Sequence, residues 1–134
     1  MIVLALVVLI VAVPILMNLS NSTTPEKVVE KYLSYFQSKD YHSAFQLFGG
    51  DILDEFLYEF GSVENAINAL TSEFDYIDFL LEKEYGQNWR NRMEIMTVKQ
   101  SERLALIEAR LDWSTFQTFE LMKIGSEWKI VEIY

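Results

Sequence analysis

The sequence contains no cysteine and a single histidine among its 134 residues. Without cysteine the chain has no disulfide, no thiolate nucleophile, no zinc-thiolate site and no lipidated N-terminal cysteine. The lone histidine, His42, lies between Tyr41 and Ser43, a setting more typical of a surface residue than of a general base. The sequence also lacks a phosphate-binding loop, a Gly-x-Ser-x-Gly motif and a nucleophile with a base at fixed spacing. We therefore predict no cofactor and favour a non-catalytic protein over an enzyme.

Basic residues are scarce, since 11 Lys and Arg stand against 20 Asp and Glu, and the net charge is −9. The first charged residue is Glu26, so all of this charge lies after residue 25. Such an acidic domain is a poor partner for nucleic acid or for an anionic lipid surface. Hydrophobic residues make up 51% of the chain, which excludes disorder, and the length suits one domain with a sizeable core.

Residues 1–17 contain no polar side chain, and as a helix they would extend about 25 Å, the short end of what crosses a bilayer. The length and the absence of a basic start favour an uncleaved transmembrane anchor over a secretory signal peptide. Pro14 and the small residues Ser20 and Ser22 favour cleavage, and a buried soluble helix is a third interpretation. An anchor and a signal peptide both place the rest of the chain outside the cytoplasm, membrane-anchored or secreted.

This segment and the polar residues after it divide the chain. We predict a transmembrane anchor or signal segment over residues 1–19, a polar linker over residues 20–24 and one domain over residues 25–134.

The first half of that domain carries apolar residues at spacings of three and four, which predict four helices. Thr24 as N-cap and Pro25 at the first helical position begin the first helix, and the polar residues 37–40 end it. The other three are predicted over residues 41–48, 51–60 and 63–85, the last capped by Ser62.

Residues 93–134 alternate between apolar and mixed positions, which predicts three antiparallel strands. Helices followed by strands predict an α+β fold, with the helices packed on one face of a curved antiparallel sheet. We expect a three-residue loop around Gly125, because a two-residue turn would place Glu120 opposite Val131. The positions predicted to face the core are Met93, Ile95, Ala105, Ile107, Ala109, Leu111, Trp113, Phe119, Leu121, Val131 and Ile133.

Two groups of residues are candidate sites. Four aromatic residues could line a pocket between helices and sheet, with core packing as the competing interpretation. Four large apolar residues on the mixed sheet face, ringed by charge, resemble the core and rim of an interface with a second copy or another protein. Helical carboxylates near residue 55 lack the loop carbonyls of a cation site, so no metal site is predicted. The pocket candidates are Tyr32, Phe36, Phe56 and Trp113, and the interface candidates are Phe116, Met122, Trp128 and Ile130.

Three stretches carry a family resemblance: Thr24-Pro-Glu-Lys-Val-Val-Glu-Lys-Tyr-Leu, Ser38-Lys-Asp-Tyr-His-Ser-Ala-Phe and Gly125-Ser-Glu-Trp-Lys-Ile-Val. Together they resemble the NTF2-like superfamily, and in particular its small secreted or membrane-tethered members. The resemblance covers residues 24–134 and implies a cone-shaped α+β fold with a pocket between helices and sheet. Its members include isomerases, dehydratases, transport factors and assembly subunits, so the fold does not choose a function.

Two functions remain open at this point. The first is a non-catalytic, membrane-tethered domain outside the cytoplasm that acts through protein contacts or holds a small apolar ligand. The second is a small exported isomerase-like or dehydratase-like enzyme or ligand carrier of the NTF2-like fold. A cavity that contains an ionisable group would favour the second.

Overall fold

The computed structural model describes residues 23–134 of the chain. The predicted anchor or signal segment, residues 1–19, and linker residues 20–22 lie outside the described residues. Within residues 23–134, no helix combines the length and the hydropathy needed to cross a bilayer.

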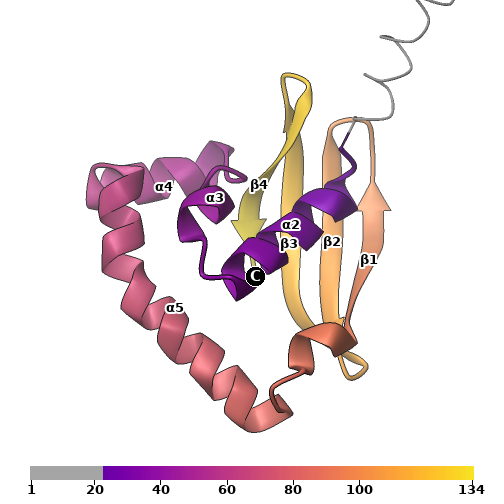
Figure 1. Cartoon of the computed structure of the whole chain (residues 1–134). Coiled ribbons are helices and arrows are strands. Elements are labelled where there is room, and N and C mark those ends of the chain that lie inside the picture. Colours follow the sequence, from indigo (N-terminus) through magenta and orange to yellow (C-terminus); the bar gives the residue numbers. More distant parts are fainter. Residues whose placement is uncertain (1–22) are drawn as a thin grey trace, which may run out of the picture.

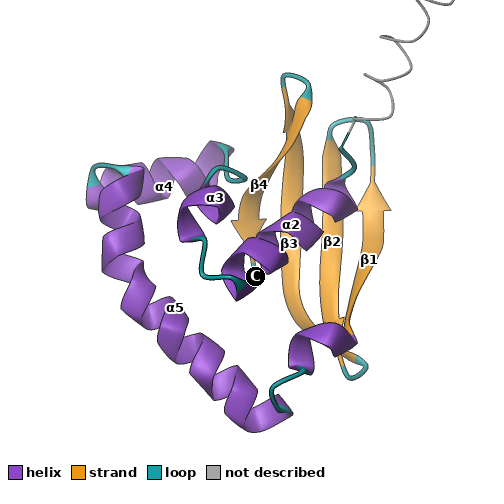
Figure 2. Cartoon of the chain, in the orientation of Figure 1, coloured by secondary structure: helices purple, strands orange, loops and turns teal. Residues whose placement is uncertain are grey.

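Helices come first and a four-stranded antiparallel sheet follows, as Figure 1 and Figure 2 show. The predicted α+β class is confirmed, but the prediction of three strands is wrong because residues 93–134 form four. The elements are α2 (Pro25–Gln37), α3 (Tyr41–Phe45), α4 (Gly50–Phe60), α5 (Val63–Tyr85), the 3-10 helix η1 (Trp89–Arg92), β1 (Met93–Gln100), β2 (Leu104–Leu111), β3 (Ser114–Ile124) and β4 (Glu127–Ile133).

The strands pair in chain order, and the helices lie on one side of the sheet (Figure 1). Helix α2 crosses the sheet, α3 and α4 lie near β4, and α5 runs from α4 to η1 along a path away from the strands. Helix α5 buries one residue, Ala66, although it is 23 residues long. Most of α5 therefore packs on the rest of the protein along one side only.

The predicted helix starts are confirmed by their caps. The Thr24 hydroxyl accepts a hydrogen bond from the Lys27 amide at 3.3 Å, and the Ser62 hydroxyl accepts one from Asn65 at 3.1 Å. Helix α3 ends at Phe45 instead of residue 48 because the chain after it pairs with β4. There the Ile130 amide donates to the Leu47 carbonyl at 2.9 Å. Satisfying these backbone groups in the sheet removes them from a helix.

The core lies between α2, α3 and the inner face of the sheet. The central strands of the sheet, β2 and β3, contribute alternate residues to the core, and most of the predicted core face is confirmed here. The aromatic rings of Tyr32 and Phe119 meet edge-on with centroids 5.4 Å apart, which ties α2 to β3. The buried sheet residues of this cluster are Ala105, Ile107, Ala109, Phe119, Leu121, Trp128 and Ile130.

The β3–β4 hairpin differs from the prediction. Its connection is a two-residue turn, since Ile124 pairs with Glu127, and Gly125 supplies the positive φ of 63° that such a turn needs. Glu120 pairs with Glu132 but Leu121 pairs with Ile130, so one extra residue of β4 forms a bulge. A bulge reverses the alternation along a strand.

The two-residue turn places two predicted interface residues in the core, and the bulge after Ile130 then shifts the register of the rest of β4. Trp128 and Ile130 lie on the same face as Leu121, where they are 8% and 0% exposed. The prediction that they lie on the exposed face is therefore wrong. Val131, the bulge residue, is 7% exposed and stays buried as predicted.

The β2–β3 turn corrects the prediction for Trp113. Leu111 pairs with Ser114, and the two residues between them, Asp112 and Trp113, have φ values of 50° and 73°. These left-handed values match a tight primed turn, which follows the twist of the strands. Trp113 is 97% exposed at its tip, so the prediction that it faces the core is wrong.

Candidate ligand pocket

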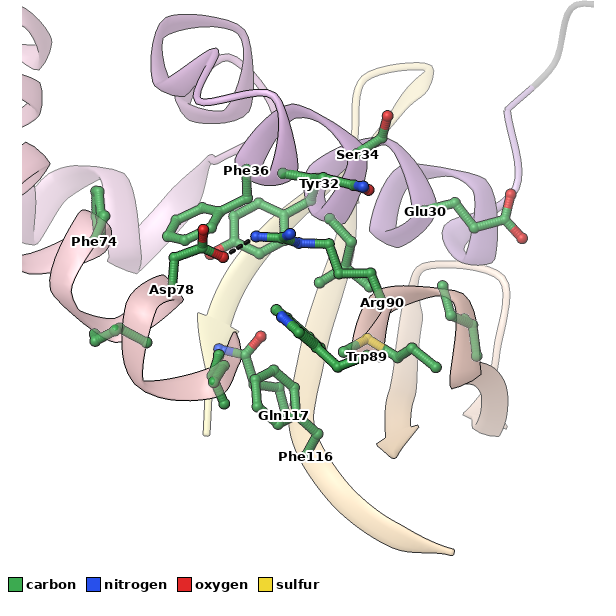
Figure 3. Close-up of a pocket in the computed structure, with 16 residues that line it drawn as sticks. Glu30, Tyr32, Ser34, Phe36, Phe74, Asp78, Trp89, Arg90, Phe116 and Gln117 are labelled. Carbon is green, nitrogen blue, oxygen red and sulfur yellow. Dashed lines mark hydrogen bonds and ion pairs between the residues drawn. The ribbon is translucent and has the colours of Figure 1, made fainter. Parts of the chain in front are cut away.

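A pocket of about 300 Å³ lies between α2, the second half of α5, η1 and the sheet (Figure 3). It exists because α5, whose one buried residue is near its start, runs from α4 to η1 without packing closely on the strands. Pockets for small molecules have volumes from about 300 to 1,000 Å³, so this one suits a small ligand. The residues that form most of its wall are Tyr32, Leu33, Phe36, Phe74, Ile77, Leu81, Trp89, Met93, Ile95 and Phe116.

The wall is mainly apolar and aromatic. The rings of Phe36 and Phe74 meet edge-on with centroids 4.9 Å apart, which joins α2 to α5. On the opposite side, the Trp89 ring packs on Phe116 at 5.7 Å. Phe116 is the extra residue of a bulge, because Ala109 pairs with Gln117 whereas Arg110 pairs with Thr115. Edge-on and offset contacts of this kind hold rings in defined positions, so the wall is largely preformed.

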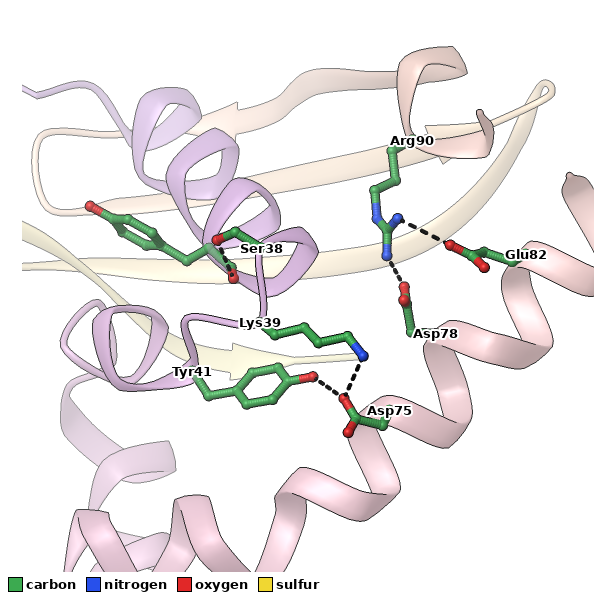
Figure 4. Close-up of polar contacts among 8 residues, drawn as sticks. Ser38, Lys39, Tyr41, Asp75, Asp78, Glu82 and Arg90 are labelled. Atoms are coloured by element: carbon green, nitrogen blue, oxygen red, sulfur yellow. Dashed lines mark hydrogen bonds and ion pairs between the residues drawn. The ribbon is translucent and has the colours of Figure 1, made fainter. Parts of the chain in front are cut away.

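One ion pair lies in the wall of the pocket. The Arg90 guanidinium of η1 contacts the carboxylate of Asp78 on α5, and its other terminal nitrogen lies 3.8 Å from Glu82 (Figure 4). The Arg90 and Asp78 side chains are only 16% and 15% exposed. Burial lowers the pKa of Arg90 below its ordinary value, and the paired carboxylate neutralises its charge. The pair thus connects η1 with the second half of α5.

Trp89 carries a buried polar group that has no partner within the described part of the chain. Trp89 is 5% exposed. Among residues 23–134, its indole nitrogen Nε1 is the one buried side-chain nitrogen or oxygen that has no hydrogen-bond partner. Figure 3 shows this nitrogen directed into the pocket, on the side where Asp78 and Gln117 lie. The guanidinium of Arg90 stacks over the same ring at 4.7 Å from its centroid. An unpaired buried donor costs about 1–3 kcal/mol, which an acceptor placed in the pocket would recover.

A second polar contact ties α3 to α5 outside the pocket. The Tyr41 hydroxyl donates to an Asp75 oxygen at 2.8 Å, and Lys39 lies 3.4 Å from the same oxygen (Figure 4). Burial, followed by the Asp75 contact, raises the pKa of Tyr41 to about 12. The same bond lowers the pKa of Asp75. No cluster of His, Asp and Glu among the described residues could hold a metal ion.

The structure brings together two of the four predicted pocket residues. Tyr32 and Phe36 line the pocket, and burial raises the pKa of the Tyr32 hydroxyl. Phe56 instead stacks on Phe48 in the core under α4, with centroids 5.7 Å apart. Trp113 lies in the exposed β2–β3 turn.

Sequence reasoning missed Asp78, Trp89 and Arg90. A Trp-Arg pair directly after a helix and a Gly-Gln-Asn turn is an available signal, because a large aromatic residue in so short a connection has to pack somewhere nearby. Which helix residue would face it depends on the direction of α5, and the sequence does not contain that direction.

The predicted interface residues do not form one patch. Phe116 is half-buried in the pocket wall, and Met122 is 40% exposed on the outer face of the sheet opposite Leu104. Trp128 and Ile130 are in the core on the other face.

Comparisons of the chain with protein-family models, curated proteins and solved structures find no match. The NTF2-like resemblance therefore stays a prediction.

Proposed function

We propose that this chain is a non-catalytic, membrane-tethered domain outside the cytoplasm that binds a small, largely apolar molecule in the pocket between α2, α5, η1 and the sheet. The observation that carries the proposal is this pocket, whose apolar wall encloses about 300 Å³ and contains one buried, unpaired donor on Trp89. Few polar groups within an apolar wall are the usual composition of a small-molecule site.

The polar groups of the pocket favour binding over catalysis. A general base has to take a proton and so lose negative charge. Asp78 is held in an ion pair with Arg90, which also lies near Glu82, and this pairing favours a carboxylate that stays charged. The described residues around the pocket offer no serine or threonine paired with a base.

Blocking the pocket tests the binding function. Met93 lines the pocket, whereas Met96 on the same strand β1 is 42% exposed on the other face. Met93→Trp should fill the space, and Met96→Trp makes the same chemical change outside it. A ligand at 100 times its Kd stabilises a protein by about 2.7 kcal/mol.

We expect 2-ethylnaphthalene to raise the thermal midpoint of the full-length protein and of Met96→Trp, and to leave the thermal midpoint of Met93→Trp unchanged. Far-UV circular dichroism and the ligand-free midpoint check that both variants are folded. An equal rise in both variants would place the binding elsewhere. No rise in the natural chain with 2-ethylnaphthalene, with its ketone analogue 2-acetonaphthone or with 2-naphthoate would refute the function.

The second candidate is an exported isomerase-like or dehydratase-like enzyme or ligand carrier, as the NTF2-like resemblance implies. The observation in its favour is the carboxylate of Asp78, an ionisable group at the pocket that also contains Tyr32. A base at this place would exchange the methyl protons of 2-acetonaphthone for deuterium in D₂O. Exchange that depends on the protein and disappears in Asp78→Asn would support the enzyme, and its absence supports the binding function.

Membrane tethering and export rest on the uncharged residues 1–17 and the confinement of charge to the region after residue 25. The absence of cysteine makes a direct test simple. Ser126→Cys places one thiol in the exposed β3–β4 turn. A membrane-impermeant maleimide should label it in intact cells, and labelling only after lysis would place the domain in the cytoplasm.

A protein partner or a second copy on the sheet face is the remaining expectation. Met122 and Leu104 form an exposed apolar pair there, 40% and 46% exposed. Because Trp128 and Ile130 are buried, the expected patch lacks two of its four apolar members. For that reason we assign the function to the pocket.

A further inference from the structure

We infer that the ligand of this pocket is an uncharged apolar molecule carrying one hydrogen-bond acceptor, such as a carbonyl oxygen, which accepts from Trp89 Nε1. The inference rests on the proposed binding function and names the chemical class of the ligand. Three features support it: the donor, the charges around it and the size of the space.

The donor is the indole N–H of Trp89. It is a donor only, so its partner has to be an acceptor. The side chain is 5% exposed, and the ring is held between Phe116 and the Arg90 guanidinium. A held ring presents its N–H in one direction, which Figure 3 shows to be into the pocket. An acceptor on the ligand would complete the hydrogen bond that the described protein leaves open.

The charges around the donor disfavour an ionised ligand. Asp78 and Glu30 line the pocket, and Glu82 lies 3.8 Å from Arg90. The guanidinium is therefore already matched by carboxylates, and an anionic head group would face them without a cation of its own. A cationic head group would face Arg90 and the positive end of the N–H bond. An uncharged acceptor meets neither repulsion.

The volume of the pocket decides which test ligands are suitable. A dry cavity of about 150 Å³ holds benzene, so about 300 Å³ accommodates a fused two-ring aromatic molecule. Three naphthalenes then form a matched series. They are 2-acetonaphthone with a neutral acceptor, 2-ethylnaphthalene with no acceptor and 2-naphthoate with a negative charge.

The experiment follows the indole N–H signals of the full-length protein, labelled with ¹⁵N-tryptophan in lipid nanodiscs. The chain has three tryptophans, so Trp89→Phe identifies the relevant signal by its loss. We expect 2-acetonaphthone to move the Trp89 proton downfield and 2-ethylnaphthalene to lack this downfield shift. Trp113→Phe is the matched control, because the same change is made at a side chain that is 97% exposed.

Affinities provide the second readout. One hydrogen bond corresponds to about a two- to tenfold change in Kd. Trp89→Phe should weaken the binding of 2-acetonaphthone by that factor and leave the Kd of 2-ethylnaphthalene unchanged. Trp113→Phe should change neither Kd. We expect 2-naphthoate to bind at least about tenfold more weakly than the ketone.

The outcomes separate this inference from the proposed function. Equal affinity for ketone and hydrocarbon, unchanged in Trp89→Phe, would overturn the acceptor while the binding function stands. Naphthoate binding as tightly as the ketone would overturn the neutral class. No binding of any of the three would refute the proposed function itself.

Discussion

Ile130 and Ile124 lie on the same hairpin, and the register set by its two-residue turn gives them different environments. Ile130 is 0% exposed in the core, whereas Ile124 near the turn is 43% exposed. Ile130→Ala removes three buried carbon atoms, or about 2.4 kcal/mol at 0.8 kcal/mol each. A cavity in a packed core adds to this, so we expect a loss of about 3 to 4 kcal/mol.

Ile124→Ala is the matched control. Slightly more than half of its side chain is buried, and solvent fills the space that is left, so we expect a loss of about 1 kcal/mol. Urea unfolding measures both variants. With a slope near 1.5 kcal/mol/M, the midpoint should fall by about 2 M for Ile130→Ala and by less than about 1 M for Ile124→Ala.

A result with equal losses, or with the larger loss at Ile124, would refute this register. It would mean that the β3–β4 connection is not the two-residue turn and that Ile130 lies on the outer face of the sheet, as the simple alternation of the sequence predicts. A change in the slope would instead indicate that the variants do not unfold in two states.

Two further predictions concern polar and backbone contacts. Tyr41→Phe removes the donor that lowers the pKa of Asp75 below its ordinary value of 3.8. Its thermal midpoint should therefore lie below that of the natural chain above about pH 4, and the difference should shrink as the pH falls through the lower folded-state pKa. Melts between pH 2 and 8 check this, and a difference that grows in acid would contradict it. Gly61→Ala should lower the free energy of unfolding by about 1 kcal/mol, because its φ is +81° while no described atom lies within contact of the added Cβ. Gly50→Ala should cost about 2 to 3 kcal/mol in the same urea assay, since its φ is +57° and the added Cβ would lie 3.0 Å from Val131. Equal costs would mean that the contact with Val131 adds nothing.

Local features of this fold follow from neighbouring residues. The first helix begins at Thr24 and Pro25, and the longest at Ser62, because a side chain three residues away caps the free amide groups. The inner residues of β2 alternate as the sequence predicts, since successive side chains of an extended strand point to opposite faces.

Features that depend on distant parts of the chain could not be predicted in this way. Alternation assigns a face only up to the next bulge, and the bulge at Val131 reverses it for Trp128 and Ile130. That bulge accompanies the pairing of Ile130 with the Phe48 region, more than eighty residues earlier in the chain. No local pattern near residue 130 contains that partner.

The pocket shows the same division. Residues 25–134 determined an aromatic first helix, and Tyr32 and Phe36 were correctly expected to line a space. Tertiary structure decided which residues complete it, because the direction of α5 and the bulge at Phe116 bring Asp78, Trp89 and Phe116 together. The sequence alone determined the class of fold, the limits of the first and the longest helix and the inner face of β2. The physical reason is range: caps and periodicities act over a few residues, whereas register and helix direction depend on packing across the whole domain.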